Sequence, residues 1–218
     1  METPVDLFRR LEQLNAIGAA LSKERDINRL LESILVAAKT ITHADGGTLY
    51  RMTEDGRALR FEILRTDSLH IAMGGTTGNP INFPNLPLTN EKGDPNDSMV
   101  AAYAAIHDKT VNIADAYTEA GFDFSGTRRF DERTGYRSQS FLTVPMKNHE
   151  GEIIGVLQLI NAQEANTNTV KPFSTEDQSL AESLASQAAI ALTNRLLITQ
   201  LEELFESFIS LITKEVAS

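Results

Sequence analysis

Four arginines crowd into residues 128–137 of an otherwise acidic chain, and they are the first candidates for chemistry. The chain has a formal net charge of −10, so a local cluster of guanidinium groups could bind an anion that the rest of the surface repels. The alternative is a solvated loop in which the arginines pair with nearby carboxylates. The arginines are Arg128, Arg129, Arg133 and Arg137, and the carboxylates are Asp123, Asp131 and Glu132.

A second polar segment, residues 161–178, follows a strongly apolar stretch and could either form a ligand site or join a strand to a helix. Ser174 and Asp177 have the spacing of a capping box, in which each side chain bonds the other residue's backbone N–H. A carboxylate at this place also meets the positive end of the helix dipole. We therefore interpret Asp177 as a helix cap.

The sequence lacks the patterns that indicate catalysis. There is no cysteine, which excludes thiolate nucleophiles, disulfides and thiol-ligated metal sites. The four histidines lie one per segment without metal-binding spacing, and neither a serine-centred elbow nor a phosphate-binding glycine loop is present. We expect no catalytic residues and no metal site, and therefore binding without chemistry.

The composition is typical of a globular protein that carries one domain of ordinary size and some additional helices. Of the 218 residues, 41% are apolar and 23% are charged. No apolar run approaches the roughly 20 residues that span a bilayer, and the first residues lack the apolar core of a signal peptide. We expect a cytoplasmic protein that binds neither membranes nor, given its acidic balance, nucleic acid.

Two helices are predicted in the first forty residues. The first has apolar positions at alternating spacings of four and three, and the second has a broader apolar stripe that begins at Ile27. Asp26 is placed to cap the second helix. The narrow seam of the first helix consists of Leu7, Leu11, Leu14, Gly18 and Leu21.

Strand patterns follow from residue 48 onward. TLYRMT and ALRFEILRT flank the turn EDGR, which predicts a hairpin, and residues 74–97 are mostly loop. A short helix capped by Asp97 or Ser98, a brief strand TVNIAD, and two strongly apolar strands, SFLTVPMKN and EIIGVLQLI, come next. We expect the last two to be the central strands. This order predicts an α+β fold with a central antiparallel sheet flanked by helices.

The helical period returns at Ser174 and continues almost to the end of the chain. The apolar seam of this segment predicts that the long N- and C-terminal helices form a helical bundle or a coiled-coil dimer. The seam consists of Ile190, Asn194, Leu197, Leu201, Leu204, Phe208 and Leu211. Because no capping glycine or proline closes the pattern, we expect the helix to continue into a further domain.

Three stretches and the order of the segments resemble a GAF domain, the small-molecule-sensing module of signalling proteins. The stretches are VNIADAY, FDERTGYRSQSFLTVPMKN and GEIIGVLQLIN, and they resemble in particular the GAF domains of cyclic-nucleotide phosphodiesterases and some adenylyl cyclases. The resemblance covers residues 26–192 and implies a GAF/PAS-like sheet. It leaves residues 1–25 as an N-terminal signalling or dimerisation helix and residues 193–218 as a coiled-coil connector.

This subclass carries a motif of Asn-Lys, Phe and Asp-Glu, which here reads Asn161, Ala162, Phe173, Asp177 and Gln178. In the family the Lys and the Asp form a buried ion pair that supports the fold near the pocket. The resemblance therefore implies structural roles for Asn161, Phe173 and Asp177. Because alanine replaces the lysine, we expect the ion pair to be absent here.

The resemblance implies a cyclic nucleotide, cGMP or cAMP, as the ligand. Backbone N–H groups after the brief strand would hold the phosphate, polar side chains after them would close over the ring, and an amide on the last strand would face the base. In this chain the positions are Ile113 and Ala114 for the phosphate, Asp131, Thr134 and Ser138 for the ring, and Gln158 for the base.

The residue pattern leaves alternatives at three of these positions. Asp131 and Thr134 could instead be cap and turn residues of a short helix that ends at Gly135. Gln158 alternates with Leu157 and Leu159, so its side chain points either to a pocket or to solvent.

The flanking helices imply how a bound ligand would act. In GAF-containing proteins such helices pack together and against a second subunit, so we expect a homodimer that relays a signal to a C-terminal output domain. The C-terminal segment resembles the connector that precedes HD-GYP domains, the cyclic di-GMP hydrolases of bacterial signalling proteins, so such a domain is the expected output. The alternative is a ligand-free dimerisation and relay module with a vestigial pocket.

Overall fold

A single antiparallel sheet organises the fold of residues 4–216, which are the residues that the computed structural model describes. The strands are β1 (Ala44–Met52), β2 (Ala58–Thr66), β3 (Ile71–Gly74), β4 (Leu86–Pro87), β5 (Val111–Ile113), β6 (Phe141–Lys147), β7 (Ile153–Gln163) and β8 (Val170–Lys171). The strand order is β3-β2-β1-β7-β6-β5, with β4 added to β2 and β8 added to β7. The predicted α+β class with an antiparallel sheet is confirmed.

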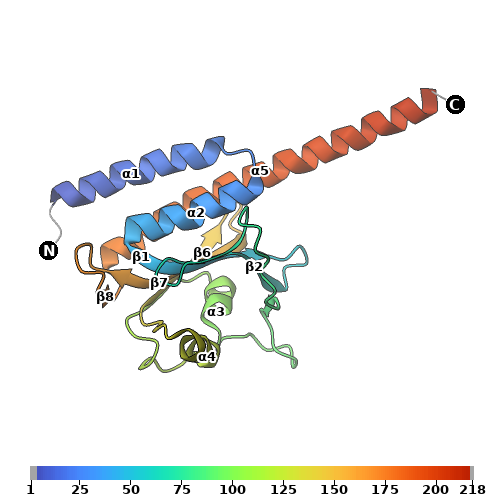
Figure 1. The fold of residues 1–218 in the computed structure, drawn as a ribbon. Coiled ribbons are helices and arrows are strands. Elements are labelled where there is room, and N and C mark those ends of the chain that lie inside the picture. The colour runs from blue at the N-terminus through green and yellow to red at the C-terminus, as the bar shows by residue number, and fades with distance from the viewer. Residues whose placement is uncertain (1–3, 217–218) are drawn as a thin grey trace.

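Helices cover both faces of this sheet (Figure 1). The helices are α1 (Pro4–Lys23), α2 (Ile27–Thr42), α3 (Val100–His107), α4 (Ser125–Thr134) and α5 (Thr175–Val216). We call the face under α1, α2 and α5 the bundle face, and the face under α3 and α4 the α3 face. No described helix is both long and apolar enough to cross a membrane.

The bundle face holds the larger part of the core. Leucines of α2, β7 and α5, such as Leu35, Leu157 and Leu184, are fully buried there. Asp26 accepts a hydrogen bond from the backbone N–H of Arg29 (2.8 Å), as the predicted cap requires. Burial of this continuous apolar layer is the main stabilising contribution to the fold.

The strand β1 begins at Ala44, four residues before the predicted start at Thr48. The intervening residues Gly46 and Gly47 pair with β7, and a side chain at Gly47 would come within 2.8 Å of Leu35 in α2. A glycine-rich segment reads as a turn in sequence, but here glycine is needed because helix and strand approach closely. As a result β1 and β7, and not β6, form the centre of the sheet.

The predicted cap of α3 is wrong, and the predicted seam of α1 is only partly right. The N-cap of α3 is Met99 without a side-chain hydrogen bond, because the Asp97 carboxylate contacts His107 instead (2.7 Å). In α1, Leu14 and Leu21 are buried, but Leu11 is 45% exposed, and the side chain of Leu7 lies outside the described residues. The first half of α5 packs on the sheet, whereas the second half projects beyond the rest of the molecule (Figure 1).

Candidate functional site

A chain of buried polar side chains crosses three adjacent strands, β1, β7 and β6, on the α3 face. Gln158 of β7 is in register with Thr48 of β1 and with Thr143 of β6. The Nε2 of Gln158 donates to Oγ1 of Thr143 (3.1 Å), and the hydroxyl of Tyr50 donates to its Oε1 (3.4 Å). Thr48 also interacts with the Tyr50 hydroxyl. The predicted base-facing residue therefore points into the protein and is 8% exposed.

Apolar clusters flank this polar chain on both sides. One contains Leu59, Ala101, Ala105 and Val156 beside Tyr50, and the other contains Val100, Ile113, Ala116, Phe124 and Phe141. The alanine-rich helix α3 contacts β6 and β7 above the chain. The α3 face of the sheet around Gln158 thus has polar groups at its centre and apolar side chains on both sides.

Burial raises the pKa of the Tyr50 phenol well above its ordinary value. The hydroxyl therefore stays protonated at neutral pH and remains a donor. Because it donates to Oε1, it holds the Gln158 amide in one orientation, with one Nε2–H directed to Thr143. A glutamine has two N–H donors and two acceptor lone pairs, so one donor and one acceptor are left over by its bonds to the residues that the structure describes.

Asp131, predicted to close over a ligand ring, instead fastens the segment that follows α4. Its carboxylate is 4% exposed and accepts hydrogen bonds from the N–H and the hydroxyl of Ser138 (both 2.8 Å). It also accepts one from the hydroxyl of Tyr117 (2.7 Å), and this acceptor raises the pKa of Tyr117. Asp131 and Ser138 are thus brought together, each by bonds within the protein.

Asn161, the first residue of the family's motif, holds the same segment from the sheet side. Its Oδ1 accepts from the N–H of Gln139 (2.7 Å) and of Ser140 (3.2 Å), and its Nδ2 donates to the carbonyl of Arg137 (2.8 Å). The residue is buried and has a φ of 57°, a left-handed conformation that asparagine tolerates better than most residues. Its structural role is plain in these contacts.

A third tie joins this segment to the start of β1. The hydroxyl of Tyr136 donates to the buried carboxylate of Asp45 (2.6 Å), which also accepts from the N–H and hydroxyl of Ser68. Burial and the adjacent Asp45 carboxylate raise the pKa of Tyr136 far above its ordinary value. Residues 134–140 are therefore held from three directions.

The remaining predicted ligand residues lie around this segment but point differently. Ile113 is buried in the cluster with Phe124 and Phe141, and Ala114 is exposed just after β5. Thr134 is the last residue of α4, is exposed, and donates to the carbonyl of Phe130 (2.8 Å). The helix ends with Gly135 in the left-handed conformation, so the turn interpretation of Thr134 matches the geometry.

The four arginines are exposed on and after α4, and their expected pairing with Asp123, Asp131 and Glu132 is not formed among the described ion pairs. Arg137 stacks on the ring of Tyr117, with 4.2 Å between the guanidinium carbon and the ring centroid. Arg128 lies 5.5 Å from the same centroid. Arg137 also contacts Asp115 at 3.5 Å, a distance that indicates a weak pair.

Asp177 forms the capping box that its spacing predicts. The N–H and hydroxyl of Ser174 donate to Oδ2 of Asp177, and the N–H of Asp177 donates back to the Ser174 hydroxyl, all at 3.0 Å. Phe173, the motif's aromatic residue, is buried in the bundle-face core.

Ala162 cannot supply the motif's cation, but Asp177 is paired all the same, because an arginine from another element supplies one. The guanidinium of Arg10 in α1 contacts Oδ1 of Asp177, and both side chains are less than 10% exposed. Arg10 also donates to the carbonyl of Ile41 at the end of α2. Of these two neighbours in α1, Arg10 is the one that is buried, whereas Leu11 is exposed.

Hydrogen bonds link the candidate site to the start of α5. The hydroxyl of Ser140 donates to the carbonyl of Lys171 in β8 (2.7 Å). On the edge strand, Nδ2 of Asn112 reaches the carbonyl of Phe173 and Oε1 of Gln178, both at 3.3 Å. The segment that follows α4 is therefore tied to β8, and the edge strand β5 is tied to the first turn of α5.

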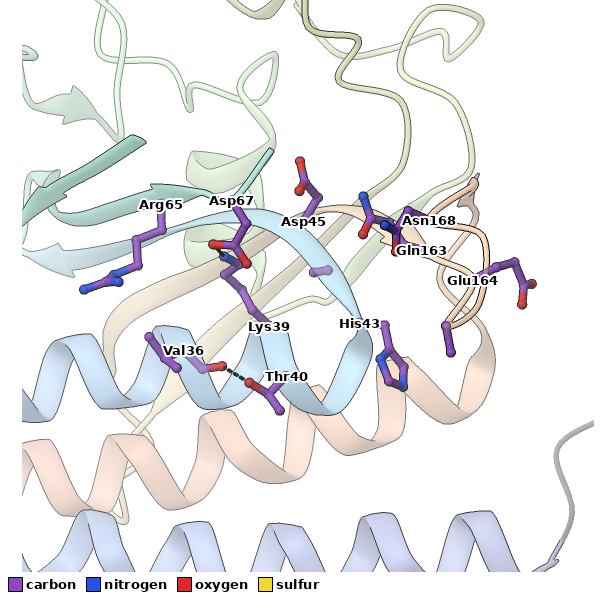
Figure 2. Close-up of a pocket in the computed structure, with 12 residues that line it drawn as sticks. Val36, Lys39, Thr40, His43, Asp45, Arg65, Asp67, Gln163, Glu164 and Asn168 are labelled. Carbon is purple, nitrogen blue, oxygen red and sulfur yellow. Dashed lines mark hydrogen bonds and ion pairs between the residues drawn. The ribbon is translucent and has the colours of Figure 1, made fainter. Parts of the chain in front are cut away.

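A cavity of about 410 Å³ lies elsewhere, at the end of the sheet beside the C-terminus of α2 (Figure 2). None of the predicted ligand residues lines it. Within residues 4–216, no group of three or more acidic or histidine side chains is placed to hold a metal ion.

Sequence reasoning identified Gln158 but missed its partners Thr48, Tyr50 and Thr143. Thr48 and Tyr50 share a face of one strand, as their spacing of two requires. What the sequence could not show was the register that sets Thr48 and Thr143 on either side of Gln158. The available signal was that each of the strands β1, β6 and β7 carries a polar residue, Thr48, Thr143 or Gln158, among apolar ones.

Comparison with curated proteins finds cyclic-nucleotide phosphodiesterases. The dual 3',5'-cyclic-AMP and -GMP phosphodiesterase 11A of Takifugu rubripes is 28% identical over 174 residues, which are 80% of this chain and 17% of that protein. The cGMP-specific 3',5'-cyclic phosphodiesterase of Drosophila mojavensis is 29% identical over 179 residues, which are 80% of this chain and 14% of that protein. The chain thus spans less than a fifth of these relatives.

Solved structures share the fold at low sequence identity. The GAF domain of an Acinetobacter phosphoenolpyruvate-protein phosphotransferase gives a TM-score of 0.62 at 14% identity, covering 92% of this chain and 99% of that one. The free methionine-R-sulfoxide reductase of Neisseria meningitidis gives 0.61 at 15% identity, covering 91% and 96%. The GAF domain family itself matches residues 26–192. Because this match extends over most of the chain, the protein belongs to the GAF domain family.

Proposed function

We propose that the chain is a regulatory sensor domain that binds a small molecule, with cGMP or cAMP as the best candidates, on the α3 face. The observation that carries this proposal is the buried polar chain through Gln158. A buried polar group weakens a core unless it is bonded, and an apolar residue at the same place would be less costly. A polar centre between two apolar clusters suits a flat, polar ligand such as a nucleobase.

The contacts divide the proposed roles among the predicted residues. Gln158 would present its free donor and acceptor to the base, and the backbone N–H groups at Ile113 and Ala114 would face the phosphate. Asp131 and Ser138 would act indirectly, because their mutual hydrogen bonds shape the segment that covers the site. Thr134 would contribute only through the end of α4.

The test is calorimetric titration of the chain with cGMP and cAMP, compared with the Gln158→Leu variant. Loss of two ligand hydrogen bonds should weaken binding by about tenfold or more. Gln163→Ala is the matched control, because it lies at the far end of the same strand. If neither nucleotide binds the unaltered chain and no small molecule is retained in native mass spectrometry, the sensing proposal fails.

That outcome would favour the second candidate, a ligand-free dimerisation and relay module. The observation that favours it is that the polar side chains of Asp131, Tyr136 and Asn161 form hydrogen bonds to other residues of the domain and do not need a ligand as a partner. In both cases we propose that the domain itself is not catalytic.

We further propose that the projecting half of α5 forms a homodimer and carries the signal onward. Large apolar side chains along this half are 48–68% exposed at the seam positions Leu197, Leu201, Leu204, Phe208 and Leu211. A stripe of this size on the half of a helix that projects beyond the rest of the molecule is typical of an interaction surface. Sedimentation equilibrium should give a dimer, and Leu204→Glu combined with Phe208→Glu should give a monomer. An output domain of the HD-GYP type after α5 belongs to the same proposal.

A further inference from the structure

The cavity at the end of the sheet is lined by none of the residues predicted to contact the cyclic nucleotide. It is formed by the C-terminal end of α2, the first residues of β1, the end of β2 with the following turn, and the turn between β7 and β8 (Figure 2). Its volume of about 410 Å³ lies in the range of small-molecule sites.

A buried cation stands at this cavity. The side chain of Lys39 is 6% exposed, and its ammonium donates to Oδ1 of Asp67 (2.5 Å). Among the side chains that the structure describes, Asp67 is the one partner of this ammonium, although an ammonium carries three N–H donors. A buried charge with unused donors is a costly arrangement unless another acceptor approaches it.

Asp67 covers the ammonium from the solvent side, and among the described residues Lys39 is the one partner of its side chain. Its side chain is 73% exposed, while its backbone is fixed by a hydrogen bond from its N–H to the carbonyl of Asp45 and one from the N–H of His70 to its own carbonyl (both 3.0 Å). Rotation of the Asp67 side chain into water would free Lys39 without moving the backbone. Figure 2 shows the two side chains meeting at the rim of the cavity.

We propose that this cavity binds a small organic acid whose carboxylate takes the place of Asp67 on Lys39. The opposite wall offers the side-chain amides of Gln163 and Asn168, for which the described residues provide no hydrogen-bond partner. Each amide can donate and accept, so the wall suits a second polar group of the ligand.

The lining also disfavours a compact group of high charge. Phosphate would place about two negative charges on one group beside Asp45, Asp67 and Glu164, whereas a dicarboxylic acid carries one charge at each end. A carboxylate is the group that the protein itself already places against Lys39. The site is therefore expected to distinguish organic acids from phosphate.

The test is thermal unfolding of the chain in succinate at constant ionic strength, with inorganic phosphate as the comparison. Binding to the folded state alone raises the unfolding temperature with ligand concentration. We expect saturable stabilisation by succinate, loss of this effect in Lys39→Met, and at least about tenfold tighter apparent binding in Asp67→Asn, because the competing carboxylate is gone.

Lys147→Met is the matched control. Lys147 forms an exposed ion pair with Asp108, so this variant removes one positive charge away from the cavity and should keep the succinate effect. If Lys39→Met does not fold, Gln163→Ala should weaken the effect several-fold while leaving the fold intact.

Three results would overturn the proposal: no succinate effect in the unaltered chain, an equal effect in Lys39→Met, or an equal effect of phosphate. Equal effects would indicate general salt stabilisation and not a site. The Gln158→Leu variant should retain the succinate response. Failure of this proposal is therefore distinguishable from failure of cyclic-nucleotide sensing.

Discussion

The ion pair between Arg10 and Asp177 should hold α1 against the rest of the molecule, and its removal should loosen that helix by about 3 kcal/mol. Arg10→Met keeps the length and the apolar stem of the side chain but deletes its charge. The variant loses a charge-assisted bond of about 1.5–3 kcal/mol to Asp177 and a further bond of about 1 kcal/mol to Ile41. Removal of one partner of a buried pair typically costs about 3–5 kcal/mol.

The lower end of that range applies because Asp177 keeps its two bonds from Ser174. A loss of about 3 kcal/mol corresponds to roughly 100-fold faster amide hydrogen exchange in α1. Exchange measured by mass spectrometry should show this change in α1 and a much smaller one in the central strands. Urea denaturation gives the accompanying change in the free energy of unfolding.

A double-mutant cycle isolates the pair itself. The cycle of Arg10→Met and Asp177→Asn should give a coupling free energy of about 2 kcal/mol. The same cycle for Lys147 and Asp108, whose side chains are both 45% exposed, should give less than about 1 kcal/mol. A coupling below about 0.5 kcal/mol for Arg10 and Asp177, or unchanged exchange in α1, would refute the reasoning.

Three further predictions concern the segment that covers the candidate site. Tyr136→Phe should reduce the free energy of unfolding by about 1.5–3 kcal/mol, because it removes a donor to the buried Asp45 carboxylate, and urea denaturation measures it. Asn161→Ala should destabilise more than Asn161→Gly by about 1 kcal/mol, because alanine resists the φ of 57°, and the opposite order would contradict this. The pKa values of Tyr50 and Tyr136 are raised in the folded protein, so their contribution to the free energy of unfolding is fully present below about pH 10, the ordinary pKa of tyrosine. Above that pH the unfolded chain binds fewer protons than the folded one, and the free energy of unfolding falls. Spectrophotometric titration combined with unfolding at each pH checks the sign.

The parts of the fold that the sequence predicts well are those with local causes. The hairpin of β1 and β2 and the pair β6 and β7 follow from alternation and from glycine turns, and the starts of α2 and α5 follow from caps at Asp26 and Ser174. The short strands β3 and β8 were not anticipated, because a few residues become a strand only when a partner strand lies beside them.

The parts of the site that escaped prediction depend on contacts between distant residues. Arg10 and Asp177 are 167 positions apart, and nothing in the local pattern of either reveals the other. The polarity of the α3 face likewise depends on cross-strand register, which the sequence of Gln158 and its neighbours does not contain. The alternation around Gln158 left its direction open between a pocket and solvent, and its exposed fraction of 8% decides for the interior.

The cation supplied by α1 bears on how such a domain can be exchanged between proteins. A recombination joint at residue 26, where the family match begins, would transfer Asp177 without Arg10 and leave a buried carboxylate in the new host without its counter-charge. Lysine at position 162 would carry the counter-charge inside the transferred segment. With Ala162, a transferred segment has to include α1 in order to keep the ion pair. We therefore expect the N-terminal helix and the sensor domain to be exchanged between proteins as one segment.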